Sequence, residues 1–123
     1  MRRASMLLLV LAACDRGGAD SPPGGDYRAV LRPASPQGAA AIELVGPGIP
    51  SVTGTASVAV YSQAAGEITR VVAMRGQPGD IAFTVTMADG QRPPVARVLE
   101  VVDGDNQPRQ VAQYRVDFDR GTP

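Results

Sequence analysis

Apolar and polar residues alternate along much of the chain after residue 26. The clearest case is residues 81–87, where large apolar side chains take every odd position from Ile81 to Met87. Successive side chains of a strand point to opposite faces, so this spacing predicts a strand with one buried face. Six further segments are rich in β-forming residues, and they span residues 27–32, 40–44, 52–61, 68–74, 95–102 and 114–118.

Turn-forming stretches rich in Gly and Pro separate these segments every 8 to 14 residues, and no later segment has helical periodicity. A parallel sheet needs long crossover connections, and these turns are too short to supply them. We therefore expect an all-β fold: an antiparallel two-layer sandwich of about seven strands, of Greek-key, jelly-roll or Ig-like type. A small closed barrel is the alternative.

Some of the predicted strands carry more specific expectations. Residues 52–61 are interpreted as one long strand with a bulge or bend at Gly54. Residues 95–102 are apolar on both faces, which is typical of a central strand. The alternation also predicts six residues that point into the core across two sheets, namely Ile81, Phe83, Val85, Tyr114, Val116 and Phe118.

A different pattern occupies the first fourteen residues. Arg2 and Arg3 precede an apolar run at residues 6–13, and the run ends at Cys14. The run is too short to cross a hydrocarbon core, which takes about 20 helical residues. A positive start, a short apolar middle and small residues at its end are the parts of a secretory signal. Cys14 is the only cysteine in the chain, and a single unpaired thiol in an exported protein needs an explanation.

The four residues that end this segment, Leu11-Ala12-Ala13-Cys14, resemble the lipobox of bacterial lipoproteins. The resemblance implies that a signal peptidase recognises Leu11, Ala12 and Ala13 and removes residues 1–13 as a signal peptide. It also implies that Cys14 carries a diacylglyceryl group and a further acyl chain such as palmitate. The protein is then expected in the bacterial cell envelope, attached to a membrane through the lipid on Cys14. Ordinary secretion and a cytoplasmic chain with a misassigned start are the alternatives.

Residues 14–26 connect this anchor to the predicted strands. After Cys14 they read DRGGADSPPGGD, which contains four glycines, two prolines and no large apolar side chain. Such a segment buries too little surface to offset its ordering entropy, so we expect a flexible tether. The β-sandwich domain is expected at residues 27–120. Asp15 resembles the signal that retains some bacterial lipoproteins at the inner membrane, and the leaflet stays open.

Composition excludes several classes of function. The chain has 12 Arg, no Lys and 12 acidic residues, and loss of residues 1–13 leaves a net charge near −2, which argues against a nucleic-acid partner. The absence of His excludes a Ser-His-Asp triad and imidazole metal ligands. The absence of Lys excludes Schiff-base chemistry and the phosphate-loop lysine. We expect no enzyme activity and no cofactor, and a minimal hydrolase that uses two carboxylates is the least favoured alternative.

One loop has the composition of a candidate metal site. Asp103, Asp105 and Asn106 place three oxygen-bearing side chains around Gly104, and calcium prefers oxygen ligands. The spacing is not that of an EF-hand, however, and Asp-Gly and Asp-Asn pairs also form tight turns because they tolerate positive φ. A turn between two strands is the favoured interpretation, and calcium binding is the alternative.

Three framework segments carry a family resemblance: AIEL followed by GPGI at residues 41–49, GDIAFTV at residues 79–85, and ARVLEVVD at residues 96–103. On these segments, residues 31–118 resemble the cohesin-like sandwiches of small lipoproteins in high-GC bacteria. The resemblance implies a jelly-roll-like sandwich related to carbohydrate-binding modules and cellulosomal cohesins. It carries over no dockerin-recognising residues, so cohesin activity is not implied.

These expectations combine into a lipid-anchored cell-envelope protein with a non-catalytic β-sandwich module for binding or structure, with protein contact as the favoured mode of action. An accessory subunit of a surface complex and a glycan-binding module are the alternatives. Sugar sites usually stack aromatic rings, and this chain has no Trp, three Tyr and two Phe. Tyr27, Phe83, Tyr114 and Phe118 fall on faces assigned to the core, which leaves Tyr61 for the surface. The sequence does not identify the protein or glycan partner.

Overall fold

Eight strands and one short 3-10 helix form within residues 24–120, the part of the chain that the computed structural model describes. The alternating segments of the sequence supply most of the strands, because β-branched and aromatic side chains fit a pleated, half-buried surface. The strands are β1 (Gly25–Arg32), β2 (Gln37–Val45), β3 (Ser51–Thr53), β4 (Val58–Ala65), β5 (Ile68–Gly79), β6 (Ala82–Met87), β7 (Val95–Asp103) and β8 (Arg115–Arg120), and the helix η2 covers Val111–Gln113.

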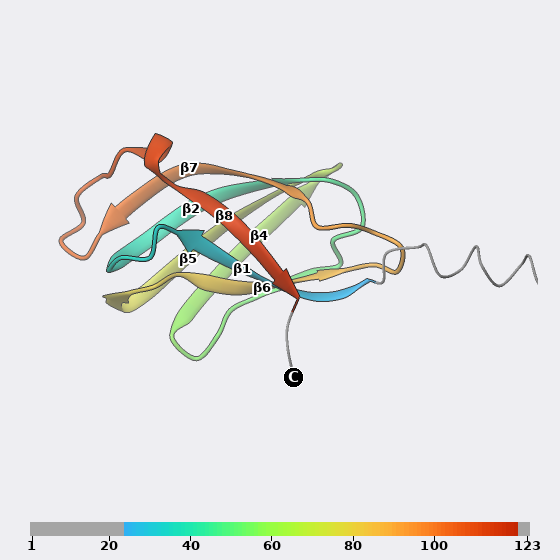
Figure 1. Cartoon of the computed structure of the whole chain (residues 1–123), viewed down its shortest axis with the longest axis horizontal. Coiled ribbons are helices and arrows are strands. Elements are labelled where there is room, and N and C mark those ends of the chain that lie inside the picture. The colour runs from blue at the N-terminus through green and yellow to red at the C-terminus, as the bar shows by residue number, and fades with distance from the viewer. Residues whose placement is uncertain (1–23, 121–123) are drawn as a thin grey trace, which may run out of the picture.

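The strands form two antiparallel sheets of four strands each (Figure 1). Sheet A has the order β3-β6-β1-β8, and sheet B has the order β4-β5-β2-β7. Figure 1 shows β8 (red) running obliquely across the direction of β2 and β5. The prediction of an all-β, antiparallel, two-layer arrangement is confirmed, and within the described residues the sheets do not close into a single barrel.

Nearly every connection passes from one sheet to the other. Among the described strands, only β4 and β5 follow one another in the chain and also pair within one sheet. Gly66, with φ +64°, begins their turn and supplies the left-handed backbone that a tight hairpin turn requires. Outside this hairpin β3 pairs with β6, β2 with β7 and β1 with β8. The chain is therefore arranged as one long hairpin folded over into two sheets.

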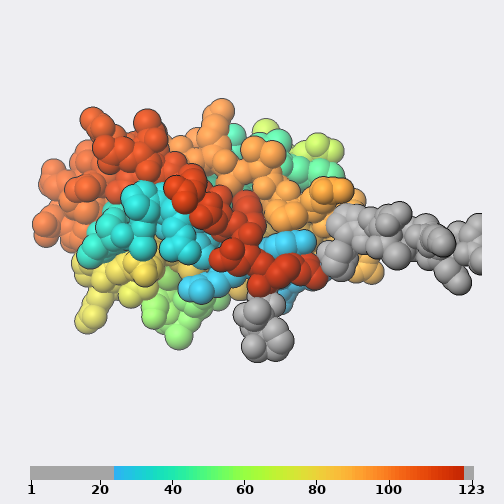
Figure 2. All heavy atoms as spheres, in the orientation of Figure 1, coloured from blue at the N-terminus to red at the C-terminus, as the bar shows by residue number. Residues whose placement is uncertain are grey.

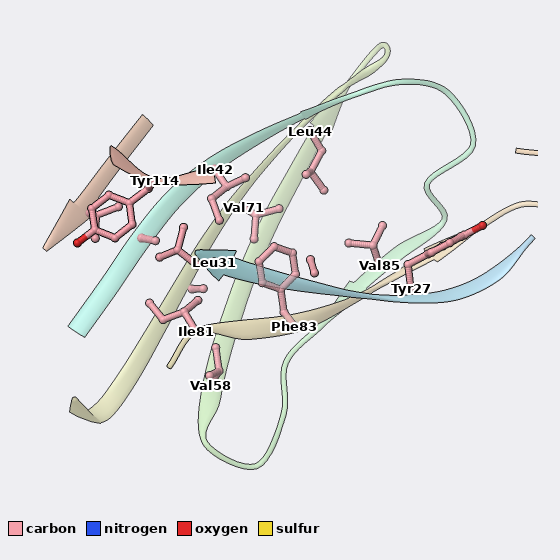
Figure 3. Packing of buried hydrophobic residues seen from close by; sticks show 14 of the residues in the cluster. Tyr27, Leu31, Ile42, Leu44, Val58, Val71, Ile81, Phe83, Val85 and Tyr114 are labelled. Atoms are coloured by element: carbon pink, nitrogen blue, oxygen red, sulfur yellow. The ribbon is translucent and has the colours of Figure 1, made fainter. Parts of the chain in front are cut away.

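Side chains from both sheets meet in a core around Phe83, which is 1% exposed (Figure 3). Figure 3 shows Phe83 pointing from β6 into the space between the sheets, toward Val71 of β5. The other inward-facing residues predicted from the sequence also belong to this core: Ile81, Val85 and Tyr114 are buried, and Val116 and Phe118 are partly buried against it. The alternation along residues 81–87 and 114–118 thus predicted the correct faces.

The interpretation of residues 52–61 as one bent strand is wrong. Val52 lies in β3 of sheet A, whereas β4 begins at Val58 and belongs to sheet B. Between them the chain turns so tightly that a Cβ on Gly54 would lie 2.2 Å from the backbone oxygen of Val58. The amide of Thr55 donates to that same oxygen over 3.0 Å and closes the turn. Gly54 is thus where the chain crosses between sheets, which gives eight strands instead of seven.

The expectation that residues 95–102 form a central strand is also wrong. The strand β7 lies at the edge of sheet B and pairs only with β2 among the described strands. The loop after β7 covers part of its free side, because the amide of Arg109 donates to the oxygen of Val101 over 2.8 Å and Pro108 forms a bridge with Val102. Apolar residues occur on both faces of β7 because the outer face of sheet B is itself apolar.

The sequence predicts that the domain starts at Tyr27. The first described strand begins two residues earlier, at Gly25. Asp26 pairs with Thr86 in β6, and the hydroxyl of Thr86 donates to its carboxylate over 2.7 Å. At the other end of the chain, Arg120 donates from Nη1 to the oxygen of Gly24 over 3.0 Å. The predicted signal peptide, the lipobox with Cys14 and residues 15–23 lie outside the described residues.

None of the secondary structure between residues 24 and 120 is a helix with the length and apolar character needed to span a membrane.

Candidate interaction surface

Most of the exposed large apolar side chains gather on one face of the molecule. The described residues include seven such side chains, and all except Val111 lie on sheet B. Inward-pointing residues such as Val71 and Ile42 are buried, so the exposed ones take the alternate positions and point away from the core. We call this surface the outer B face, and its large apolar residues are Val45, Tyr61, Ile68, Val72, Met74 and Val95.

Strand register aligns these side chains in rows across sheet B. Ile68 of β5 lies opposite Val45 of β2, which in turn lies opposite Val95 of β7. Further along the same strands, Tyr61 of β4 lies opposite Val72 of β5. Large exposed apolar side chains that gather on one face of a soluble protein mark interaction sites. The outer B face is therefore the candidate functional surface of this domain.

A charged row separates the apolar rows. Glu43 of β2 lies between Arg70 of β5 and Arg97 of β7 in the strand register. Its two carboxylate oxygens lie 3.5 Å from Arg70 Nε and 3.5 Å from Arg97 Nη2. Glu43 is 8% exposed, whereas the side chains of both arginines are 70% exposed. The two arginines thus cover the carboxylate, neutralise it and leave a net positive charge in the middle of an apolar surface.

Small side chains on β2 leave a shallow groove in the outer B face. Ala39 and Ala41 form its floor, and Val72 and Val102 stand on the neighbouring strands at its sides. The groove has a volume of about 180 Å³, and Glu100 is the only charged residue that lines it. A surface of this shape accepts a short apolar side chain from a partner better than it accepts a polar one.

The opposite side of the molecule has a different character. Figure 2 shows the side on which β8 (red) and β1 (blue) lie next to each other. On the outer face of sheet A, Asp117 forms ion pairs with Arg32 at 3.6 Å and with Arg115 at 3.1 Å. Exposed pairs of this kind contribute little to stability and are typical of an ordinary solvated surface. The apolar surface is thus specific to sheet B.

The structure brings Asp103, Asp105 and Asn106 together in the turn after β7. Asp103 Oδ1 accepts hydrogen bonds from the amides of Asp105 over 2.8 Å and Gln107 over 3.0 Å. The amide of Asn106 donates to the backbone oxygen of Asp103, and Asn106 adopts φ +63°. Hydrogen bonds from Gln107 and then Asp105, with the charge of Arg109 3.9 Å away, lower the pKa of Asp103 below its usual value of 3.8.

This arrangement agrees with the predicted turn between strands. One oxygen of Asp103 accepts two backbone amides, and the other faces Arg109, so both are engaged in the turn itself. Within residues 24–120 no group of three or more His, Cys, Asp or Glu side chains is placed to hold a metal ion. Calcium binding by Asp103, Asp105 and Asn106 stays the alternative prediction for this loop.

The aromatic residues divide as the sequence predicted. Tyr27, Phe83 and Tyr114 are buried, and Phe118 packs partly buried against the core. Tyr61 is 64% exposed on the outer B face. A single exposed ring offers less stacking area than sugar recognition usually employs.

Sequence reasoning missed the outer B face, although a signal for it was present. Residues 68–74 read ITRVVAM, with apolar side chains at both odd and even positions and therefore on both faces of the strand. Residues 95–102 have the same pattern, which was expected to reflect burial on both faces. In both segments the second set of apolar residues belongs to the outer B face.

Comparison with known proteins found no matching family model, no similar curated protein and no similar solved structure.

Proposed function

We propose that this chain is a lipid-anchored protein of the bacterial cell envelope whose β-sandwich is a non-catalytic module for binding or structure, acting through protein contact. In this proposal residues 1–13 are the signal peptide and Cys14 carries the lipid. The tether, predicted to reach residue 26, ends at Gly24 because β1 begins at Gly25. An accessory subunit of a surface complex is the variant in which the partner is obligatory. Both the inner and the outer membrane are compatible with this proposal, and Asp15 is the residue that favours the inner membrane.

The lipobox Leu11-Ala12-Ala13-Cys14 supports the anchor. A buried methylene contributes about 0.8 kcal/mol, and one acyl chain alone holds a protein only marginally. Two or three chains on Cys14 give stable attachment without a spanning segment. The unpaired cysteine of an otherwise cysteine-free chain then has a role.

The observation that carries the contact function is the outer B face. It gathers six exposed large apolar side chains on one sheet, whereas none of the exposed large apolar side chains of the described residues lies on a strand of sheet A. Exposing such a surface to water costs free energy and favours association, so its presence is best explained by a partner that covers it.

The pairing scheme also supports a finer assignment of the fold. Strands β1 with β8, β2 with β7, β3 with β6 and β4 with β5 pair as in a hairpin that has been folded over. Eight strands in two sheets with this pairing are typical of a jelly roll. We propose a jelly-roll sandwich, with the cohesin-like resemblance as part of that proposal.

The anchor is tested by metabolic labelling with a fatty acid analogue, followed by fractionation of cells. The native chain should incorporate label and sediment with membranes. Cys14→Ala should lose the label and either leave the membrane fraction or retain residues 1–13. A Cys14→Ala protein that is cleaved normally and still bound to membranes would contradict the anchor.

The contact function is tested by capturing crosslinked partners from cells with the native chain and with two variants. Val72→Glu places a charge in the centre of the outer B face, whereas Thr53→Glu places the same charge on exposed β3 of sheet A. Captured partners should decrease with Val72→Glu and persist with Thr53→Glu. An unchanged set of partners with Val72→Glu would assign the contact to another surface.

A further inference from the structure

Three of the four sheet edges are protected against pairing with another chain. The edge strand β8 carries four charged residues in six, and β3 has only three residues. The edge strand β7 has a bulge where its register shifts opposite residues 41–42 of β2. Two prolines at residues 93–94 come directly before it, and the loop around Arg109 covers its C-terminal half. Charges, short length, bulges and covering loops are the usual means of preventing unwanted strand pairing.

The fourth edge, β4, lacks these features. Its sequence, VAVYSQAA, contains no charged residue and no proline, and its pairing with β5 has no register shift. Thr55 and Gly54 cover its beginning near Val58, but residues 61–65 are exposed. Figure 1 shows that the β4–β5 hairpin extends past the strands of sheet A, so the second half of β4 has no covering layer.

The direction of the backbone groups on β4 follows from one hydrogen bond. The oxygen of Val58 accepts from Thr55, which lies outside sheet B, so Val58 directs its backbone groups away from β5. In an antiparallel ladder, residues two apart direct their groups to the same side. Ser62 and Ala64 therefore present their N–H and C=O groups to the outside of the sheet, where no described strand lies beside them.

We propose that β4 pairs with β4 of a second copy of this chain, antiparallel and across a two-fold axis. Gln63 lies at the axis opposite Gln63 of the second copy, and Ser62 exchanges hydrogen bonds with Ala64 of that copy. This register uses the exposed half of β4 and avoids the part near Val58 that Thr55 covers. The inference rests on the proposed function in one respect, that the domain acts through protein contact.

A second copy fits this edge for two reasons. Antiparallel self-pairing places each residue opposite one from the same strand, and an uncharged strand does so without opposing like charges. Among the described strands each chain has one unprotected edge, so pairing it symmetrically leaves no open edge for a third copy and closes the assembly at two. The two B sheets then form one continuous sheet, and the two outer B faces join beside Tyr61.

The test uses the full chain carrying Cys14→Ala, so that an introduced cysteine is the only thiol. Residues directly opposite in a non-hydrogen-bonded pair have Cβ atoms about 4.5–5.5 Å apart, close enough for a disulfide after small adjustment. Gln63→Cys should therefore give a disulfide-linked homodimer under mild oxidation, seen on a non-reducing gel. Gln113→Cys, on the exposed helix η2, is the matched control and should stay monomeric.

A third variant separates specific pairing from chance collision. Ser62→Lys, added to Gln63→Cys, places like charges within the paired edge without removing a contact to β5. It should reduce the crosslinked fraction to that of Gln113→Cys, with an unchanged circular dichroism spectrum. The proposal is overturned by absence of the Gln63→Cys homodimer, by equal crosslinking at Gln113→Cys, by crosslinking that Ser62→Lys leaves unchanged, or by a product that contains a different protein.

The outcomes distinguish this proposal from the proposed function. Loss of the homodimer together with normal lipid labelling and Val72-dependent capture rejects the dimer and leaves the envelope function standing. A specific homodimer in a chain that takes up no lipid supports the dimer and rejects the anchor.

Discussion

The side-chain amide of Gln37 donates a hydrogen bond from Nε2 to the hydroxyl of Tyr114 over 3.0 Å. The two residues are 77 positions apart, and the bond connects β2 in sheet B to the segment that leads into β8 in sheet A. Gln37 is 2% exposed; its Nε2 also donates to Ser35 Oγ, and its Oε1 has no hydrogen-bond partner in the described structure. A buried polar group thus fixes how the two sheets meet at one end of the sandwich.

Removing only one member of this pair should destabilise the domain. Tyr114→Phe takes away the acceptor and leaves the Gln37 amide buried, which should cost about 1–3 kcal/mol in urea unfolding. Adding Gln37→Met to Tyr114→Phe should recover most of that loss, because both polar groups are then replaced by apolar ones. The single variant Gln37→Met completes the comparison. If the double variant loses at least as much stability as Tyr114→Phe and Gln37→Met lose in sum, the pair contributes by packing alone.

Phe83 should dominate the stability of the core. Its ring is 1% exposed between the sheets, so Phe83→Ala should lower the free energy of unfolding by about 3–5 kcal/mol. The neighbouring change Thr84→Ala affects the outer face of sheet A and should alter stability by less than about 0.5 kcal/mol. Chemical denaturation of both variants provides the comparison, and losses of similar size would reject the assignment of faces in β6.

The Arg70–Glu43–Arg97 row should contribute a salt-sensitive stabilisation. Glu43→Gln leaves two arginines on either side of a neutral residue, and because both are largely exposed the expected cost is about 1 kcal/mol. The difference from the native chain should shrink in about 1 M salt, where the screening length is about 3 Å. Glu67→Gln, in the exposed turn after β4, is the control and should show neither effect.

The lowered pKa of Asp103 should make stability depend on acid pH. A carboxyl whose pKa is lower in the folded state stabilises the fold above its unfolded pKa of 3.8, and this contribution is lost as the pH falls through the folded pKa. Asp103→Asn cannot lose a charge, so its melting temperature should fall less steeply below about pH 4 than that of the native chain. Parallel profiles for Asp103→Asn and the native chain would reject the role of this carboxylate.

The sequence predicted which residues face the core wherever one face of a strand is polar. Along residues 81–87, Thr84 and Thr86 marked the outer face, and Phe83 and Val85 proved buried. Alternation carries no information about which sheet a strand joins, so the crossing at Gly54 was interpreted as a bend within one strand. For the same reason the edge position of β7 was missed.

The burial of Glu43 could not be predicted from the local sequence pattern, because the residues that cover it come from other strands. Its side chain alternates with the buried Ile42 and Leu44 and points outward, yet arginines from β5 and β7 cover it. Those arginines lie 27 and 54 positions further along the chain and meet Glu43 only through the pairing of β2 with both neighbours. The outer B face likewise depends on the order of strands in the sheet, which no single segment encodes.

The pairing of β1 with β8 has a consequence for the order of folding. Tyr27 lies opposite Arg120, and Arg32 lies opposite Arg115. The first described strand to be synthesised therefore cannot pair fully until the last described strand has been made. Contacts between such distant positions slow folding, because the ends must be brought together before the contacts repay that entropy. A chain that emerges N-terminus first can complete sheet A only after Arg120 has emerged. The topology therefore delays completion of sheet A until synthesis has passed the last described strand, whereas all strands of sheet B are made earlier.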